Sequence, residues 1–205
     1  MYRLNDQQHP VVNQARELSK TIVAKHAQDV DEKARFPIES IEALAKAGFG
    51  GLLVPQEFGG MGQGIRTLAA VVDELAQSCP STAMVYMMHN SGVNCYLADS
   101  NKFSETLRSC ARGEHLSTLA FSEKGSRSQF WAPVSQVVAS GDNQCNLSAE
   151  KSWVTSAGYA DGIVSSFAPS MAAEPASSWL RKATRVSRSR VAGTVSVCAV
   201  TRATR

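Results

Sequence analysis

The sequence has few of the features that mark secreted, membrane-spanning or metal-built proteins. No stretch approaches the roughly 20 consecutive apolar residues that a membrane-spanning helix needs, and the first six residues lack the apolar run of a secretory signal. The five cysteines are an odd number without a Cys-x-x-Cys pair, which favours neither a disulfide framework nor a zinc site. We therefore expect a cytoplasmic protein with no membrane partner and no metal site.

Charge is also scarce, and it is unevenly placed. The 205 residues are 43% hydrophobic and 19% charged, as in an ordinary globular protein of one or two domains. The formal net charge is +3, yet residues 168–205 hold seven of the 21 Lys and Arg residues and only one of the 18 acids. Residues 1–167 are therefore slightly acidic. They show no basic stripe interleaved with aromatic residues, so no nucleic-acid partner is expected.

Residues 1–113 are predicted to form a bundle of five helices. Val11, Ala15, Leu18 and Ile22 recur at steps of four, three and four, which predicts one apolar helical face within a helix over about 8–34. A second helix is expected to begin at Pro37 and to end at Gly48. Similar patterns predict three more helices, around 68–75, from residue 80 onward, and from about 101 or 104 to 113.

The pattern changes after residue 113. Short Val-rich or apolar runs, separated by Gly and Asp, predict strands over 116–121, 134–140, 146–148, 152–155 and 163–167. The expected fold class is α+β, with an N-terminal all-α helical bundle (1–113) followed by an incomplete antiparallel β-barrel or sandwich domain (114–167). Residues 168–205 are rich in Ala, Ser and Arg without a sustained period. They are expected to be a disordered tail or a frame-shifted reading of the gene.

Three segments resemble motifs of the acyl-CoA dehydrogenase family. Residues 48–60, GFGGLLVPQEFGG, are similar to a family segment ending in Val-Pro-x-Glu-Tyr-Gly-Gly. Residues 119–128, LAFSEKGSRS, resemble the flavin loop Thr-Glu-Pro-Gly-x-Gly-Ser-Asp, and residues 148–157, SAEKSWVTSA, resemble Asn-Gly-x-Lys-x-Trp-Ile-Thr-Asn. Each motif alone is modest, but their order and spacing make a strong signal. The likeness covers residues 8–167.

The resemblance implies an FAD flavoprotein that removes an α-proton and a β-hydride from an acyl-CoA thioester and passes the hydride to flavin N5. The implied partners are an acyl-CoA substrate, an electron-transfer flavoprotein and further copies of the chain in a dimer or tetramer. A flavin-dependent monooxygenase of the same fold is a second hypothesis. A third is a non-enzymatic gene remnant or interaction module.

The flavin-binding residues implied by the resemblance are Phe121, Ser122, Ser128, Trp153 and Thr155. Ser122 stands where the family has Thr, and Ser128 stands at the Ser of Gly-Ser-Asp, so both keep a hydroxyl that can donate to the flavin ring. Trp153 offers a flat face to cover the isoalloxazine. Thr155, two residues further along an expected strand, would point to the same side.

Other positions have two interpretations. His89, in the helix with Met84, Met87 and Met88, is either a packed helix residue or a substrate contact beside the acyl pocket; the methionines themselves are expected in the core. Ser128 is a second candidate substrate contact.

Three further positions concern the loop and the chemistry. Glu123 either orients the flavin loop or lies in solvent. Lys124 and Gln129 depart from the family's Pro and Asp, which affects the substrate contacts. No catalytic base is assigned, because the family's Glu lies in a C-terminal helical domain that this sequence lacks, so the chain is expected to be truncated and inactive alone.

Overall fold

The computed structural model describes residues 2–127, 129, 132–139, 144–167, 186–188 and 195–202, the last two ranges and residues 137–139 and 144–148 by their backbone alone. The chain divides into two compact units, Met1–Ser117 and Thr118–Arg205. The first unit is helical and the second carries the strands.

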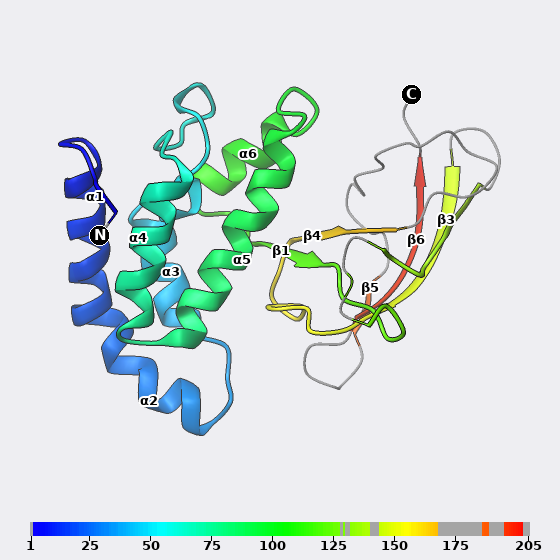
Figure 1. Ribbon diagram of the computed structural model, residues 1–205, viewed down its shortest axis with the longest axis horizontal. Helices are drawn as coiled ribbons and strands as arrows, with labels where there is room; N and C mark the ends of the chain where they lie inside the picture. Colours follow the sequence, from blue (N-terminus) through cyan, green and yellow to red (C-terminus); the bar gives the residue numbers. More distant parts are fainter. Residues whose placement is uncertain are drawn as a thin grey trace. The chain divides into compact units, whose positions relative to one another are not determined.

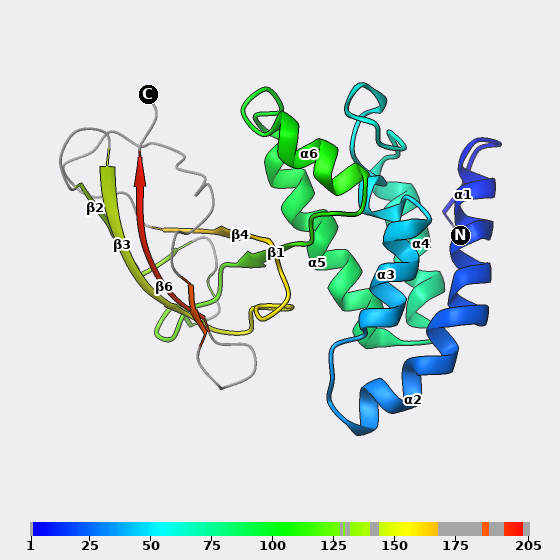
Figure 2. The same cartoon turned by 180° about the vertical axis from the view of Figure 1, so that it is seen from behind.

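The helical unit contains the five predicted helical runs. Their bounds are α1 Gln8–Leu18 continuing through the π-helical turn η1 Ser19–Val23 into α2 Ala24–Glu32, then α3 Ile38–Lys46, α4 Ile65–Ala76, α5 Pro80–Leu97 and α6 Ser104–Ala111. Two single 3₁₀ turns, η2 Phe49–Gly51 and η3 Gln56–Phe58, lie between α3 and α4. Helices α1, α4 and α5 lie side by side in both views, and α5 also contacts α3 and α6 (Figure 1, Figure 2).

The buried face of the first helix differs from the predicted one. Val12, Ala15, Ser19 and Val23 are buried, whereas three of the four predicted face residues are only half-buried. The difference begins at Val11 and Val12, before the π-helical turn, so the buried face is rotated by about one residue from the predicted stripe along the whole first helix. Ser19 is part of this face because its hydroxyl donates to the Glu74 backbone oxygen at 2.7 Å.

The segment between α3 and α4 packs through glycines. Gly48 ends α3 in the left-handed conformation, at φ +83°, as predicted for a helix stop. A Cβ on Gly60 would lie 2.1 Å from the backbone oxygen of Val54, so only glycine fits this close approach. Hydrogen bonds from the Met61 and Gln63 N–H groups to the carbonyls of Gly51 and Leu52 close the segment on itself.

Helix α5 is the central helix of the unit, and its core face is not the methionine stripe. Half of its 18 residues are buried, including Val85, Tyr86, His89 and Val93. Met84 is 48% exposed, and Met87 and Met88 are half-buried, so the expectation of a methionine core is wrong. The helix contacts neighbours on several sides, and a single apolar stripe therefore does not identify its buried face.

The second unit contains two sheets. Strand β1, Ser117–Ala120, pairs with β4, Gly162–Ser165, in a two-stranded sheet. A four-stranded sheet has the order β2-β3-β6-β5 and is antiparallel throughout, with β2 Val137–Ala139, β3 Gln144–Lys151, β5 Val186–Arg188 and β6 Val195–Arg202 (Figure 2). A helical region followed by a small sheet agrees with the expected class, while closure into a barrel or sandwich stays a prediction.

Two expectations about strands differ from the structure. Residues 152–155 are not a strand, because β3 ends at Lys151 and the chain enters a series of turns up to Tyr159. Strands β5 and β6 lie within the segment 168–205, where no element was expected. The rest of that segment lies outside the described residues, and its disorder or frame-shifted origin stays a prediction.

Candidate functional site

Two of the segments singled out by sequence are joined in the second unit. The Ser152 N–H donates to the backbone oxygen of Ser122 at 2.9 Å, and Glu123 forms an isolated antiparallel bridge with Lys151. These backbone contacts bring the loop after β1 beside the turn after β3. The motifs at 119–128 and 148–157, about 30 residues apart in sequence, therefore lie side by side in the fold.

Glu123 orients the loop rather than lying in solvent. Its side chain is 1% exposed and forms an ion pair with Lys151. Its other carboxylate oxygen, Oε2, accepts the backbone N–H groups of Val134 at 2.7 Å and Ser135 at 2.9 Å. The carboxylate thus connects the loop after β1 to the approach to β2. Of the two interpretations of Glu123, the structure supports the first.

Lys151 is fully buried at the end of β3. Besides the ion pair with Glu123, its Nζ donates to the backbone oxygen of Ser166 at 2.6 Å and lies 4.7 Å from the centre of the Phe167 ring. A buried ammonium needs several such partners, because an unpaired charge in an apolar interior is very costly. The sequence placed this lysine in a motif without assigning it a role.

Burial and pairing shift the pKa values of both members of this pair. Burial opposes ionisation of Glu123, but the bonds from Lys151 and from the backbone of Ser135 and Val134 outweigh it, so the pKa of the Glu123 carboxyl lies below its ordinary value. Burial lowers the pKa of the Lys151 ammonium, and Glu123 offsets part of that effect. The pair is therefore held as two ions by its mutual contact.

Trp153 takes an unusual position for a large aromatic residue. Its side chain is exposed, with 86% of the residue accessible, and its backbone is in the left-handed region at φ +58°. The argument that Trp153 and Thr155 share one face of a strand is wrong, because neither residue lies in a strand. A bulky residue held in a left-handed conformation is strained, and such strain is concentrated at functional positions.

The turn after Trp153 places one hydroxyl that sequence reasoning missed. The backbone oxygen of Thr155 accepts the Thr118 hydroxyl at 2.6 Å, which ties the turn to β1. The next residue, Ser156, is also left-handed at φ +61°, and its hydroxyl is buried without a hydrogen-bond partner among the described residues. The Ser156 hydroxyl is therefore buried within the turn and does not face the exposed side of the turn at Trp153.

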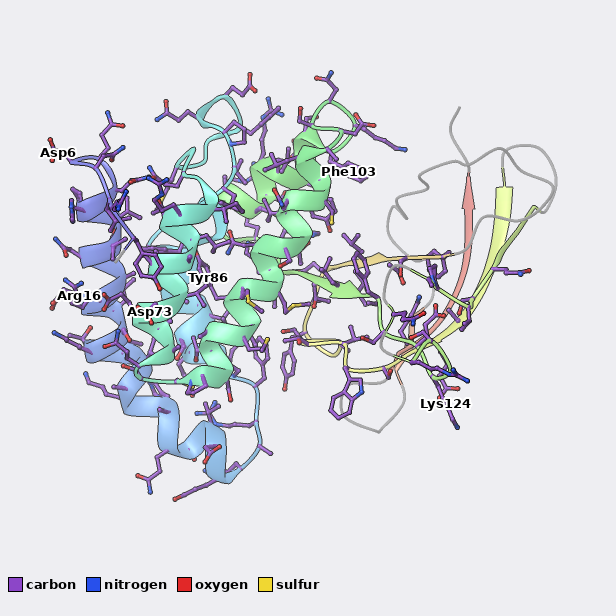
Figure 3. All side chains as sticks on the ribbon, in the orientation of Figure 1. Asp6, Arg16, Asp73, Tyr86, Phe103 and Lys124 are labelled. Carbon is purple, nitrogen blue, oxygen red and sulfur yellow. The ribbon has the colours of Figure 1, made fainter. Side chains whose placement is uncertain are left out.

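The remaining predicted flavin residues are placed less fully. Phe121 and Ser122 are half-buried at the end of β1, directly before Glu123. Ser128 lies outside the described residues. Lys124 is exposed, and its side chain points away from the unit in Figure 3. The loop turns at Ser126, whose N–H and hydroxyl both donate to the Glu123 backbone oxygen.

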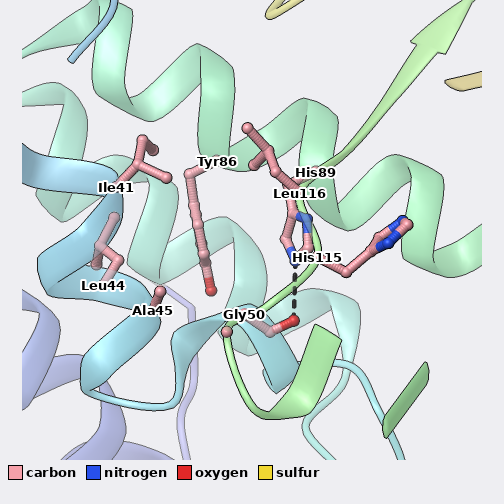
Figure 4. Close-up of a pocket in the computed structure, with 9 residues that line it drawn as sticks. Ile41, Leu44, Ala45, Gly50, Tyr86, His89, His115 and Leu116 are labelled. Atoms are coloured by element: carbon pink, nitrogen blue, oxygen red, sulfur yellow. Dashed lines mark hydrogen bonds between the residues drawn. The ribbon is translucent and has the colours of Figure 1, made fainter. Parts of the chain in front are cut away.

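His89 lines a separate apolar pocket inside the helical unit. The pocket is small, with a cavity volume of about 40 Å³, and lies among α3, α5 and the segment before β1, lined by Ile41, Leu44, Ala45, Gly50, Tyr86, His89, Gly113, His115 and Leu116 (Figure 4). His89 is 3% exposed. Its Nδ1 accepts the Ser117 N–H at 3.1 Å, so its Nε2 carries the proton and donates to the Gly50 oxygen at 2.8 Å.

This hydrogen bonding makes His89 a neutral residue. Burial lowers its pKa to about 4, with the Gly50 bond opposing that effect and His115 adding to it. The nearby Tyr86 hydroxyl donates to the Phe49 backbone oxygen at 3.0 Å, and burial raises the pKa of this phenol. Both rings thus anchor the segment after α3. This arrangement agrees with His89 as a packed helix residue, and its role as a substrate contact stays a prediction.

The described part of the chain contains no group of three or more His, Cys, Asp or Glu side chains placed to hold a metal ion. Among its helices, none is both long enough and apolar enough to cross a bilayer.

The comparisons with known proteins identify the family. A family model described as the acyl-CoA dehydrogenase N-terminal domain matches residues 5–113, which is more than half of the chain and covers nearly all of the helical unit. The chain therefore belongs to the acyl-CoA dehydrogenase family, an oxidoreductase family.

Among its curated relatives is the probable acyl-CoA dehydrogenase YngJ of Bacillus subtilis, 26% identical over 166 residues, which are 80% of this chain and 43% of YngJ. The chain thus spans less than half of that relative's length. Butyryl-CoA dehydrogenase from Megasphaera elsdenii shares the fold with a TM-score of 0.73 at 20% identity, over 80% of this chain and 44% of that one. The nitrososynthase from Micromonospora carbonacea shares it with a TM-score of 0.69 at 23% identity, over 82% and 44%.

Proposed function

We propose that this chain carries the flavin-binding loop of an FAD-dependent acyl-CoA dehydrogenase. The observation that carries the proposal is the exposed, left-handed Trp153 beside Ser122. The backbone of Trp153 is strained, and the residue is 86% exposed, so packing within its own unit does not stabilise this conformation. Its conformation makes physical sense when the ring covers a planar ligand. The curated relatives of the chain are named acyl-CoA dehydrogenases, which supports the same conclusion.

The residues of the site suit a flavin. Trp153 supplies a flat face for the isoalloxazine ring. Ser122, which is joined to the turn of Trp153 through the Ser152 N–H bond to its backbone oxygen, supplies a hydroxyl. Phe121, Thr155 and Ser128 complete the proposed set, Ser128 from outside the described residues.

When bound, FAD supplies the acceptor for the hydride that leaves the β-carbon of an acyl-CoA thioester. The residues of this chain bind and orient it. The hydroxyls of Ser122 and Ser128 would donate hydrogen bonds that favour added negative charge on the ring, and Trp153 would exclude water from one face. No residue of this chain is proposed as the base that takes the α-proton. That Glu is expected in the C-terminal helical domain of the family, so we propose that the chain alone does not turn over.

His89 is proposed to border the acyl group through shape rather than charge. Its two ring nitrogens already bond to Ser117 and Gly50, so the ring offers an apolar edge. An acyl-CoA substrate, an electron-transfer flavoprotein and a homo-oligomeric assembly are proposed as partners of the complete enzyme.

FAD binding by the 205-residue chain tests the proposal directly. The purified chain is mixed with FAD and passed through gel filtration, and the visible spectrum of the protein fraction is recorded. We expect retained flavin absorbance. Colourless protein that is folded by circular dichroism would contradict a flavin site complete within this chain. A Trp153→Ala variant provides the internal control, since loss of the ring should reduce the retained flavin without unfolding the chain.

A further inference from the structure

We propose that the buried Glu123–Lys151 ion pair is the positioning device that holds the two flavin segments, residues 121–127 and 152–156, in register with one another. The inference rests on the function proposed above. It assigns a role to two residues that touch neither the flavin nor the substrate in that proposal, and whose effect passes through Ser122 and Trp153.

Four separate stretches of chain meet at this pair. Glu123 holds the approach to β2 through the N–H groups of Val134 and Ser135. Lys151 holds the residues after β4 through the backbone oxygen of Ser166 and the ring of Phe167. The two loops, the segment before β2 and the segment after β4 are therefore all connected through the contact between Glu123 and Lys151. Removing either charge leaves the partner buried without compensation.

The pair is unlike every other ion pair among the described residues. In each of the others, at least one side chain is more than a third exposed, as in Arg16–Glu74 and Arg112–Glu105, whereas Glu123 and Lys151 are 1% and 0% exposed. Exposed pairs fix the positions of their side chains only weakly, because water competes for the charged groups. A buried pair adds little stability compared with apolar packing, so its main effect is to fix the relative positions of the segments that carry it.

The pair lies next to the proposed flavin residues in sequence, so it fixes their positions relative to one another. Glu123 follows Ser122 directly, and Lys151 precedes Trp153 by two residues. The Ser152 N–H bond to the Ser122 oxygen spans the same gap. A shift of either charged side chain therefore moves the hydroxyl of Ser122 relative to the ring of Trp153, and misplacement of such groups costs binding strongly.

The first test follows the loops without any flavin. Hydrogen–deuterium exchange is measured on the whole chain and on the variants Glu123→Gln and Lys151→Met. We expect exchange about tenfold faster or more at the amides of Val134, Ser135 and Ser152 in both variants, with α4 and α5 unchanged. Unchanged exchange at these amides would overturn the proposal. Glu150→Gln is the matched control, because Glu150 is exposed on β3 beside Lys151 and its substitution removes the same charge.

The second test measures the dissociation constant for FAD in the same variants. We expect it to rise about tenfold or more in Glu123→Gln and Lys151→Met, to stay unchanged in Glu150→Gln, and to recover in part in Lys151→Arg, which retains the cation. Recovery by the conservative variant separates positioning from a general loss of structure. Faster exchange with unchanged FAD affinity would overturn the link to the flavin.

The two tests also separate this inference from the proposed function. If the unmodified chain binds no FAD, the flavin site proposed for this chain fails, and the exchange measurement still decides whether the pair holds the two loops together. If the chain binds FAD and the exchange is unchanged in the variants, the function stands and the positioning role fails.

Discussion

At the scale of single residues, two side chains in this chain adopt states that an average protein environment does not produce. Trp153 is left-handed and exposed, and His89 is buried, neutral and bonded at both ring nitrogens. The left-handed backbone of Trp153 is strained, which lowers the stability of the fold. Burial of His89 lowers the pKa of its ring, so the folded chain binds a proton there less readily than the unfolded chain does. Each state has a measurable consequence.

Replacing Trp153 should separate stability from flavin binding. Glycine adopts φ +58° without strain and alanine does not. We therefore expect the free energy of unfolding of Trp153→Gly to exceed that of Trp153→Ala by about 1 kcal/mol. Both variants lack the ring and should bind FAD about tenfold more weakly than the original chain. Urea denaturation and FAD titration check the two parts. Equal stability of the two variants would show that the turn is not strained.

His89 should make the helical unit sensitive to acid. Its pKa is about 4 when folded and about 6.5 when unfolded, so between these values the unfolded chain binds a proton that the folded chain does not. Stability therefore falls as the pH falls. Between pH 7 and pH 5 we expect a loss of about 2 kcal/mol from this residue. Urea unfolding of the chain and of His89→Gln at both pH values gives the difference, and equal losses would contradict the assignment.

At the scale of elements, the segment between α3 and α4 shows how one motif organises the helical unit. Gly48 ends α3, the N–H groups of Met61 and Gln63 close the segment, and Tyr86 and His89 of α5 hold its backbone oxygens at Phe49 and Gly50. The motif that resembles the family is therefore a packing motif here. Its glycines are explained by contacts with the backbone.

The close approach at Gly60 provides the test at this scale. A Cβ there would overlap the Val54 backbone, so Gly60→Ala should lower the free energy of unfolding by at least about 2 kcal/mol. At Gly64, which precedes α4, a Cβ would meet no atom within 4 Å. Gly64→Ala should therefore cost less than about 1 kcal/mol, the usual cost of alanine at a helix N-cap. Thermal or urea denaturation compares them, and similar losses would contradict the packing argument.

At the scale of the whole molecule, the chain spans 43% of the length of YngJ. Among the residues that the structure describes, β2 and β5 are the outer strands of the sheet β2-β3-β6-β5. An outer strand leaves one row of backbone N–H and C=O groups for another partner.

We therefore expect the isolated 205-residue chain to self-associate. Light scattering coupled to gel filtration should show a mass that rises with protein concentration, because strand edges pair with other copies. The dependence should be steeper than for a protein with covered edges at the same concentrations. A monodisperse monomer with a single cooperative melt would contradict this expectation.

Much of the helical unit was predictable because helices depend on local signals. Pro37 and Gly48 bracket α3, and apolar spacing marks α4, since these features act within one turn of the chain. The buried faces were less predictable. The first helix buries Val12 and Ser19 where its spacing predicted Val11 and Leu18. Helix α5 has neighbours on several sides, and its apolar residues do not mark its buried face, since Met84 is exposed while Asn90 is buried. Contacts with other elements decide both outcomes.

The proposed flavin site divides in the same way. Motif residues and turn chemistry are local, so the residues alone were enough to indicate the family, the order of the helical and β regions, and the segments that carry Ser122 and Trp153. That Trp153 lies in an exposed turn beyond the end of β3, and that Glu123 and Lys151 meet across 28 positions in a buried pair, became visible in the folded chain. Burial and the pairing of buried charges depend on segments distant in sequence coming together, which no local pattern encodes.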